Sequence, residues 1–235
     1  MLRSLVVNAD DLGLTAGVNK GIFDAHDRGV VTSTSMFANA FATTHALAGA
    51  VQRPSLGVGC HLTLVDGRPT LPPACPPIFA IVTRLADRFR IPVVRVPFEW
   101  SSNLYGDTTQ RRTARSQAFL NAALLPWAWR DYRRAAQAGV RTPHFIGRTH
   151  TGVLSAQALA AMVRALPPGV TELMVHPGYV DETLARLNTR LLDARANEVH
   201  LLTDASTFDL LIEQRIGLIC HDLSRSEQRG LRRAS

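Results

Sequence analysis

The sequence predicts a single α/β domain in which parallel strands are joined by helices on the outside of a sheet or barrel. The 235 residues, 46% of them hydrophobic, are enough for one sizeable core. Short runs of β-forming residues alternate with amphipathic helical stretches, which is the pattern of βαβ units. No apolar run reaches the ~20 residues of a membrane span, so we expect a cytoplasmic protein.

The expected elements follow one another along the whole chain. Strands are predicted at residues 5–7, 31–36, 56–64, 93–96, 144–146, 172–175 and 217–220. Helices are predicted at residues 18–27, 78–89, 156–166 and 181–196. Residues 68–77 contain five prolines and residues 99–115 have little periodicity, so both stretches are predicted to be loops. We therefore treat residues 1–235 as one domain.

The net charge of +7 raises the question of nucleic-acid binding. The basic residues are nearly all arginine and are dispersed, apart from a short basic tail from about residue 224, which could be disordered. We therefore expect non-specific attraction to anionic surfaces and no nucleic-acid partner. Three cysteines without close spacing predict neither a disulfide framework nor a zinc site.

The first predicted strand leads into an adjacent pair of carboxylates, Asp10 and Asp11. Two neighbouring carboxylates repel each other unless a cation or a proton separates them, which suits one metal ligand and one general base. The alternative is that one Asp caps the following helix, with Thr15 or Asn19 sharing that role.

Two histidines lie in or directly after predicted strands. His61 is surrounded by apolar residues, so it is either a buried core histidine or, together with Asp10 and Asp11, a metal ligand. His176 precedes Pro177 and Gly178, which end the strand and expose the imidazole as a candidate acid or base. A turn histidine without catalytic role is the alternative for His176.

Further charged residues occur at or near strand ends. Arg95 could orient a carboxylate or the substrate, or form a surface ion pair, and His150 follows another strand. Arg195 and Glu198, three residues apart, have the spacing of an ordinary helix pair worth tenths of a kcal/mol.

Five segments together resemble the YdjC-type carbohydrate deacetylases, which include chitooligosaccharide deacetylases. The segments are Asn8-Ala9-Asp10-Asp11-Leu12-Gly13, Gly59-Cys60-His61-Leu62-Thr63-Leu64, Gly67-Arg68-Pro69, Val94-Arg95-Val96-Pro97 and Glu172-Leu173-Met174-Val175-His176-Pro177-Gly178-Tyr179. The likeness continues through Arg195, Glu198 and Leu202-Thr203-Asp204, so it covers most of the chain.

The resemblance implies an irregular (βα) barrel-like fold related to polysaccharide deacetylases and one divalent metal ion, Mg or Zn. It implies hydrolysis of N-acetyl groups on amino sugars or short oligosaccharides. By this resemblance Asp10 is the general base, His176 the acid, and Asp11 and His61 metal ligands. Arg95, His150 and Tyr179 are then expected near the substrate. A homodimer is one possible assembly.

The chain departs from the family pattern after the Gly-Arg-Pro loop. Members carry a further stretch there with closely spaced histidines, one of which completes the metal site, whereas residues 71–79 contain no histidine. We expect one strand-helix unit to be absent and the metal to bind weakly. Two functions stay open: an active deacetylase with a substitute ligand such as His150, or an impaired relative that still binds sugars.

Overall fold

The computed structural model describes residues 2–62, 78–100, 108–123 and 125–221. Its strands are β1 (Arg3–Leu12), β2 (Ser33–Met36), β3 (Gly57–Cys60), β4 (His144–Ile146), β5 (Gly169–Val175) and β6 (Ile216–Leu218). Its longer helices are α1 (Ala16–Asp27), α2 (Thr43–Val51), α3 (Ile78–Arg88), α4 (Thr108–Ala123), α5 (Leu125–Gln137), α6 (Ala156–Arg164), α8 (Asp193–Thr203) and α9 (Ala205–Glu213). Two short helices are α7 (Glu182–Arg186) and the 3-10 turn η1 (Arg148–His150).

β1 is the central strand of the sheet. The order is β3-β2-β1-β5-β4, and β6 also pairs with β1. β5 runs beside β1 from Arg3 to Ala9, while on the other edge β6 pairs with the beginning of β1 and β2 with its end. All these pairings are parallel. The carboxyl ends of β1, β2, β3 and β5 therefore meet at one edge, where ligands bind in such sheets.

The two faces of β1 have different environments because successive side chains alternate. Leu5, Val7 and Ala9 are buried in the main core. That core also holds side chains from α1, α2, α6, α8 and α9. The opposite face carries Val6, Asn8 and Asp10. The candidate site residue Asp10 thus lies on the face turned away from the main core.

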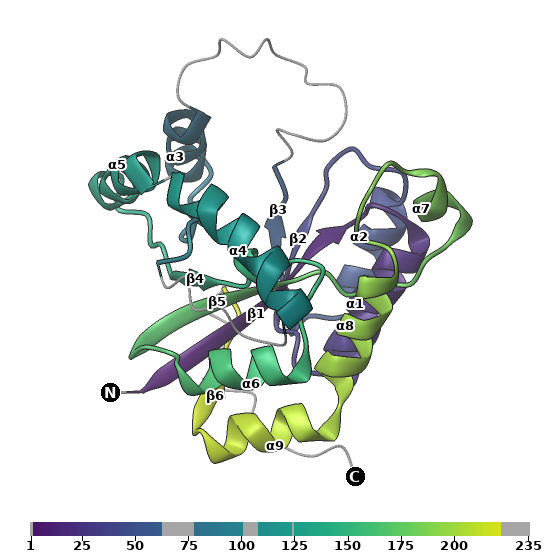
Figure 1. Cartoon of the computed structure of the whole chain (residues 1–235). Coiled ribbons are helices and arrows are strands. Elements are labelled where there is room, and N and C mark those ends of the chain that lie inside the picture. The colour runs from purple at the N-terminus through teal and green to yellow at the C-terminus, as the bar shows by residue number, and fades with distance from the viewer. Residues whose placement is uncertain (1, 63–77, 101–107, 124, 222–235) are drawn as a thin grey trace.

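A second, smaller hydrophobic cluster lies beside the sheet. It contains Val96, Phe98 and Ala128, with Phe79 and Tyr132 packed against it. Figure 1 shows α3, α4 and α5 grouped together, apart from α1, α2 and α8. This cluster holds residues 96–98 in place, immediately after Arg95.

The predicted α/β class is confirmed, and most element positions agree with the sequence analysis. The strand at residues 144–146 coincides with β4, and α1, α3 and α6 lie within a few residues of their predicted bounds. β3 pairs with β2 and has no partner on its other edge among the described residues, as expected if a strand is absent. The proline-rich stretch and the basic tail lie outside the described residues.

Three element predictions were wrong. Residues 93–96 form a single bridge, Val93 to Arg141, because the flanking Pro92 and Pro97 cannot donate to a ladder. The helix expected at residues 181–196 is two helices, α7 and α8, because the backbone is extended at Leu187. The loop expected at residues 99–115 includes the start of α4. Helices α2, α5 and α9 were not predicted.

In the described part of the chain, no helix is both long enough and apolar enough to cross a membrane.

Candidate functional site

A β-bulge places both adjacent carboxylates at the same edge of the sheet. Ala9 pairs with Thr34 and Leu12 with Met36, so two residues of β1, Asp10 and Asp11, face one residue of β2. Asp11 has a φ of 75°, a left-handed conformation that is uncommon for residues other than glycine. In a regular strand the two side chains would point to opposite faces. The bulge instead allows both to contribute to one site.

Neither aspartate caps α1, so the alternative considered for this pair is wrong. The Thr15 side chain accepts a hydrogen bond from the amide of Val18 and forms the cap. Asn19 Oδ1 accepts one from the amide of Gly13 at 2.6 Å. Neither carboxylate is therefore needed to cap α1, and both have other partners.

Asp10 is held by a two-point interaction with Arg95. The Arg95 guanidinium donates to the two carboxylate oxygens at 2.6 and 2.7 Å. Asn8 and Ser35 donate to Oδ1 at 2.8 and 2.9 Å. Burial opposes ionisation of Asp10, but the Arg95 charge and hydrogen bonds outweigh it and hold the Asp10 pKa well below its usual range. Asp10 is consequently a fixed, ionised carboxylate.

Arg95 is itself held by Glu172 on β5. Arg95 Nε donates to Glu172 Oε1 at 2.5 Å, and His221 Nε2 lies 3.1 Å from Glu172 Oε2. Burial of Glu172 favours its neutral form, but Arg95 and His221 prevail and lower its pKa. A continuous row of polar groups therefore runs from His221 through Glu172 and Arg95 to Asp10. The surface ion pair considered for Arg95 is wrong, since both of its partners are buried.

Asp11 has its own arginine partner, Arg195 on α8. Arg195 Nη2 donates to Asp11 Oδ2 at 2.6 Å, and its Nε donates to the Leu191 carbonyl at 3.0 Å. Arg195 is 1% exposed, so the pair is desolvated. Each carboxylate is thus neutralised by a separate guanidinium, which reduces the repulsion between them.

His61 faces Asp11 with one ring nitrogen and Ser35 with the other. Its Nδ1 lies 2.8 Å from Ser35 Oγ and its Nε2 lies 3.8 Å from Asp11 Oδ1. Because Ser35 donates its hydroxyl proton to Asp10, Nδ1 must carry the proton in this contact. In the neutral ring Nε2 then has a lone pair toward Asp11, the form in which a histidine binds a metal ion. The core-histidine alternative does not account for this arrangement.

Asp11 and His61 fit a divalent ion as two of its ligands. His61 Nε2 and Asp11 Oδ1 are 3.8 Å apart, so both atoms can bind one ion at metal–ligand distances of about 2.0–2.2 Å. Among the described residues, no group of three His, Cys, Asp or Glu side chains could hold an ion. His150 therefore does not complete the site in this structure, contrary to the hypothesis of a substitute ligand.

His176 follows β5 and is fixed by Glu198 on α8. Its backbone N–H donates to Glu198 Oε2 at 2.5 Å. Its imidazole interacts electrostatically with Asp10, and its buried Nδ1 has no hydrogen-bond partner among the described residues. Burial raises the pKa of Glu198, although the His176 amide and Arg195 oppose this effect. The His176 ring is thus fixed at the carboxyl end of β5, near Asp10.

The remaining candidates lie elsewhere. His150 is buried in η1, 3.0 Å from Thr149 Oγ1 through its Nδ1. Thr149 in turn donates from its amide and hydroxyl to Glu99. Tyr179 donates its hydroxyl to Asp24 on α1 at 2.8 Å, so its described contacts are with that helix and not with Asp10.

Sequence reasoning missed four participants: Ser35, Glu172, Arg195 and Glu198. The reading of Arg195 and Glu198 as an ordinary helix pair was wrong, because one binds Asp11 and the other the His176 amide. A charged residue in the apolar strand Glu172-Leu173-Met174-Val175 was the one signal that could have indicated Glu172.

The ionised state of Asp10 predicts a pH effect on stability. Its folded pKa is lowered, so its contribution is present above the unfolded carboxyl value and is lost as pH falls toward the folded value. We expect the difference in free energy of unfolding between wild type and Asp10→Asn to shrink as pH drops from about 5 to about 2. Urea titrations across this range would measure it, and a constant difference would contradict the assignment.

These features define the class of protein: a parallel α/β protein with carboxylates and imidazoles gathered at the carboxyl ends of its strands, as in many hydrolases. The profile of the YdjC-like protein family matches residues 4–76 and 74–213. The chain therefore belongs to the YdjC-like family. The two matched segments overlap at residues 74–76, within the stretch of residues 71–79 that contains no histidine.

Relatives with assigned names are similar over most of the chain. A carbohydrate deacetylase of Halalkalibacterium halodurans is 31% identical, covering 85% of this chain and 94% of its own. One from Geobacillus stearothermophilus is 27% identical over 94% of this chain and 98% of its own, in an alignment of 274 residues. That alignment exceeds the 235 residues here, so the relative carries segments that this chain lacks.

A solved structure has the same fold. It belongs to a protein of Enterococcus faecalis proposed to cleave cellobiose phosphate, with a TM-score of 0.69 and 20% identity. The match covers 94% of this chain and 98% of that one.

Proposed function

We propose that this protein hydrolyses the N-acetyl group of an amino sugar or short oligosaccharide, releasing acetate and a free amine. The observation that carries the proposal is the bulge of β1, which brings Asp10 and Asp11 beside His61 and close to His176. The names of the relatives, carbohydrate deacetylases, support the same reaction.

In the proposed reaction Asp10 acts as general base and His176 as general acid. Asp10 takes a proton from water while the water oxygen attacks the acetyl carbonyl carbon. His176 gives a proton to the nitrogen as the C–N bond breaks, so that a neutral amine departs. Arg95 keeps Asp10 ionised and oriented, at the expense of some proton affinity.

A weakly bound divalent ion is part of the proposal. Asp11 and His61 would hold it, as the geometry of their facing oxygen and nitrogen atoms allows. When bound, such an ion would polarise the acetyl carbonyl and acidify water. Two protein ligands provide less affinity and less fixed geometry than three.

Substrate contacts and location complete the proposal. Arg95 is expected to act chiefly by orienting Asp10, while His150 and Tyr179 stay proposed sugar contacts. A cytoplasmic location and a homodimer stay predictions from the sequence.

The direct test is acetate release by the purified chain. Substrates would be N-acetylglucosamine and N-acetylated chitooligosaccharides of two to four units, with Mg²⁺ or Zn²⁺ added, and both acetate and free amine would be quantified. We expect equal amounts of the two products. No release from any of these substrates at high enzyme concentration would refute the proposal.

The alternative function is that of an impaired relative that binds sugars without cleaving them. It is favoured by the lack of a third ligand among the described residues. Saturable binding of a chitooligosaccharide in calorimetry, together with no acetate release from the same sugar, would establish this alternative.

Metal affinity gives a further prediction. We expect Asp11→Ala and His61→Ala each to weaken Zn²⁺ binding by at least tenfold in calorimetry, because each removes one of two ligands. His144→Ala, which removes an exposed histidine outside this site, is the matched control. Equal affinities for all three variants would rule out the proposed ligands.

A further inference from the structure

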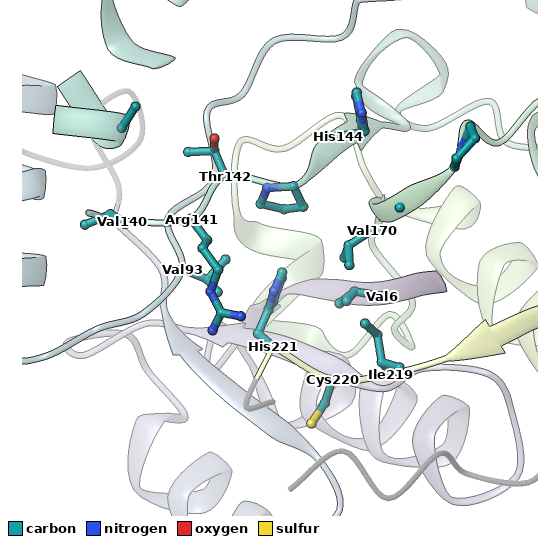
Figure 2. A pocket seen from close by; sticks show the side chains of 14 residues that line it. Val6, Val93, Val140, Arg141, Thr142, His144, Val170, Ile219, Cys220 and His221 are labelled. Atoms are coloured by element: carbon teal, nitrogen blue, oxygen red, sulfur yellow. The ribbon is translucent and has the colours of Figure 1, made fainter. Parts of the chain in front are cut away.

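A separate pocket lies at the opposite end of the sheet from Asp10. It has a volume of about 440 Å³, within the range of about 300–1,000 Å³ typical of small-molecule sites. Val6 and Val170, near the beginnings of β1 and β5, form part of its wall (Figure 2). Asp10 lies four positions after Val6 along β1, or about 13 Å away at strand spacing. The pocket is therefore distinct from the proposed catalytic site.

The wall of this pocket combines apolar side chains with cationic or potentially cationic ones. The apolar side chains include Val6, Val93, Val140, Val170 and Ile219. The basic side chains are Arg141, His144 and His221, and no Asp or Glu is among the described residues that line it. An apolar body with a negatively charged group is the complementary ligand.

Arg141 is well placed to hold such a charge. Its backbone is anchored, because its N–H donates to the Pro92 carbonyl at 3.1 Å and its carbonyl accepts from the Val94 amide at 3.0 Å. Figure 2 shows its side chain among those that line the pocket, with His221. Within the described residues, no carboxylate lies within ion-pair distance of its guanidinium. A guanidinium without a carboxylate partner can pair with the carboxylate or phosphate group of a ligand.

The neighbouring carboxylate does not cancel this charge. Glu172 is engaged by Arg95 and by His221, and it is not part of the pocket wall. His221 thus borders the pocket and also contacts the row of polar groups that leads to Asp10. A protonated His221 would be paired with Glu172, so the charge left for a ligand is that of Arg141.

We propose that this pocket is a second binding site, for a small organic anion that has an apolar body and a carboxylate or phosphate head. The apolar body would contact the valines, and the head would pair with Arg141. This site is independent of the deacetylase reaction proposed above.

The test is direct binding of model anions, which does not depend on turnover. The probes are benzoate and phenyl phosphate, with benzyl alcohol as the neutral analogue, titrated by calorimetry and by NMR chemical shifts. We expect saturable binding of at least one anion, at least tenfold tighter than benzyl alcohol. The tighter of the two anions identifies the preferred head group.

Two variants and a control locate the site. Arg141→Gln should weaken the anion at least tenfold, the loss expected for one charge-assisted hydrogen bond. Ala136→Trp should block the pocket, since Ala136 lines it and is exposed. Arg84→Gln removes an exposed arginine on α3, outside the pocket, and should leave binding unchanged.

Three results would overturn the proposal. The first is no saturable binding of either anion at concentrations up to about 10 mM, and the second is an affinity for benzyl alcohol equal to that for the anions. The third is an equal loss of anion affinity in Arg141→Gln and Arg84→Gln. Because Arg141 and Arg84 are both exposed, both variants are expected to fold, which circular dichroism would verify.

Discussion

Replacing Asp10 by Asn is expected to reduce the kcat of deacetylation by about 10²–10⁴-fold, the usual contribution of a general base. Asn has nearly the same shape and can still contact Ser35, but it cannot accept the proton of the attacking water. The KM for a chitooligosaccharide and the affinity for Zn²⁺ should change little, since Asp11 and His61 are untouched. Initial rates of acetate release over a range of substrate concentrations would measure both parameters.

The matched control for this substitution is Asp204→Asn. Asp204 caps α9 by accepting a hydrogen bond from the Ser206 amide, and Asn is an equally good cap. If Asp10→Asn keeps the kcat of the control, Asp10 is not the base.

Removing Arg195 is expected to have the largest effect on stability. Arg195→Met removes the hydrogen-bond donor of Asp11 Oδ2. It also removes the hydrogen bond from the Arg195 side chain to the Leu191 carbonyl. Breaking one partner of a buried ion pair costs about 3–5 kcal/mol in the free energy of unfolding. Urea denaturation at neutral pH would measure this loss.

Arg28→Met is the comparison for the Arg195 variant. Arg28 pairs with Asp24 at 2.8 Å, but its side chain is 65% exposed. An exposed pair contributes about 0–1 kcal/mol, so this variant should remain close to wild type. Similar losses in the two variants would mean that the Asp11–Arg195 pair has no special structural role.

These two predictions concern residues that the sequence indicates to different degrees: Asp10 could be predicted as a site residue, and Arg195 could not. Asp10, Asp11, His61 and His176 follow or interrupt apolar strands, and in a parallel sheet such residues converge at one edge. The sequence could therefore predict that they gather. Arg195 could not be assigned in this way, because its spacing to Glu198 also fits an ordinary surface pair on a helix.

Some elements of the fold could likewise be predicted from the sequence, and others could not. Periodicity predicted β4 with its observed bounds and placed α1, α3 and α6 within a few residues of theirs. It failed at residues 181–196, where the extended backbone at Leu187 divides one apparent helix into two. It also failed at residues 93–96, which have strand-like composition but whose flanking prolines leave one bridge to Arg141.

The sequence by itself determined the α/β class, the residue types of the candidate site and the lack of a histidine in residues 71–79. These features depend on local composition and order along the chain. The tertiary structure decided that Asp10 and Asp11 share one edge, because the bulge exists only through the register of β1 against β2. It also decided which arginine neutralises each carboxylate, since Asp10–Arg95 and Asp11–Arg195 join residues distant in sequence through the packing of the sheet with α8.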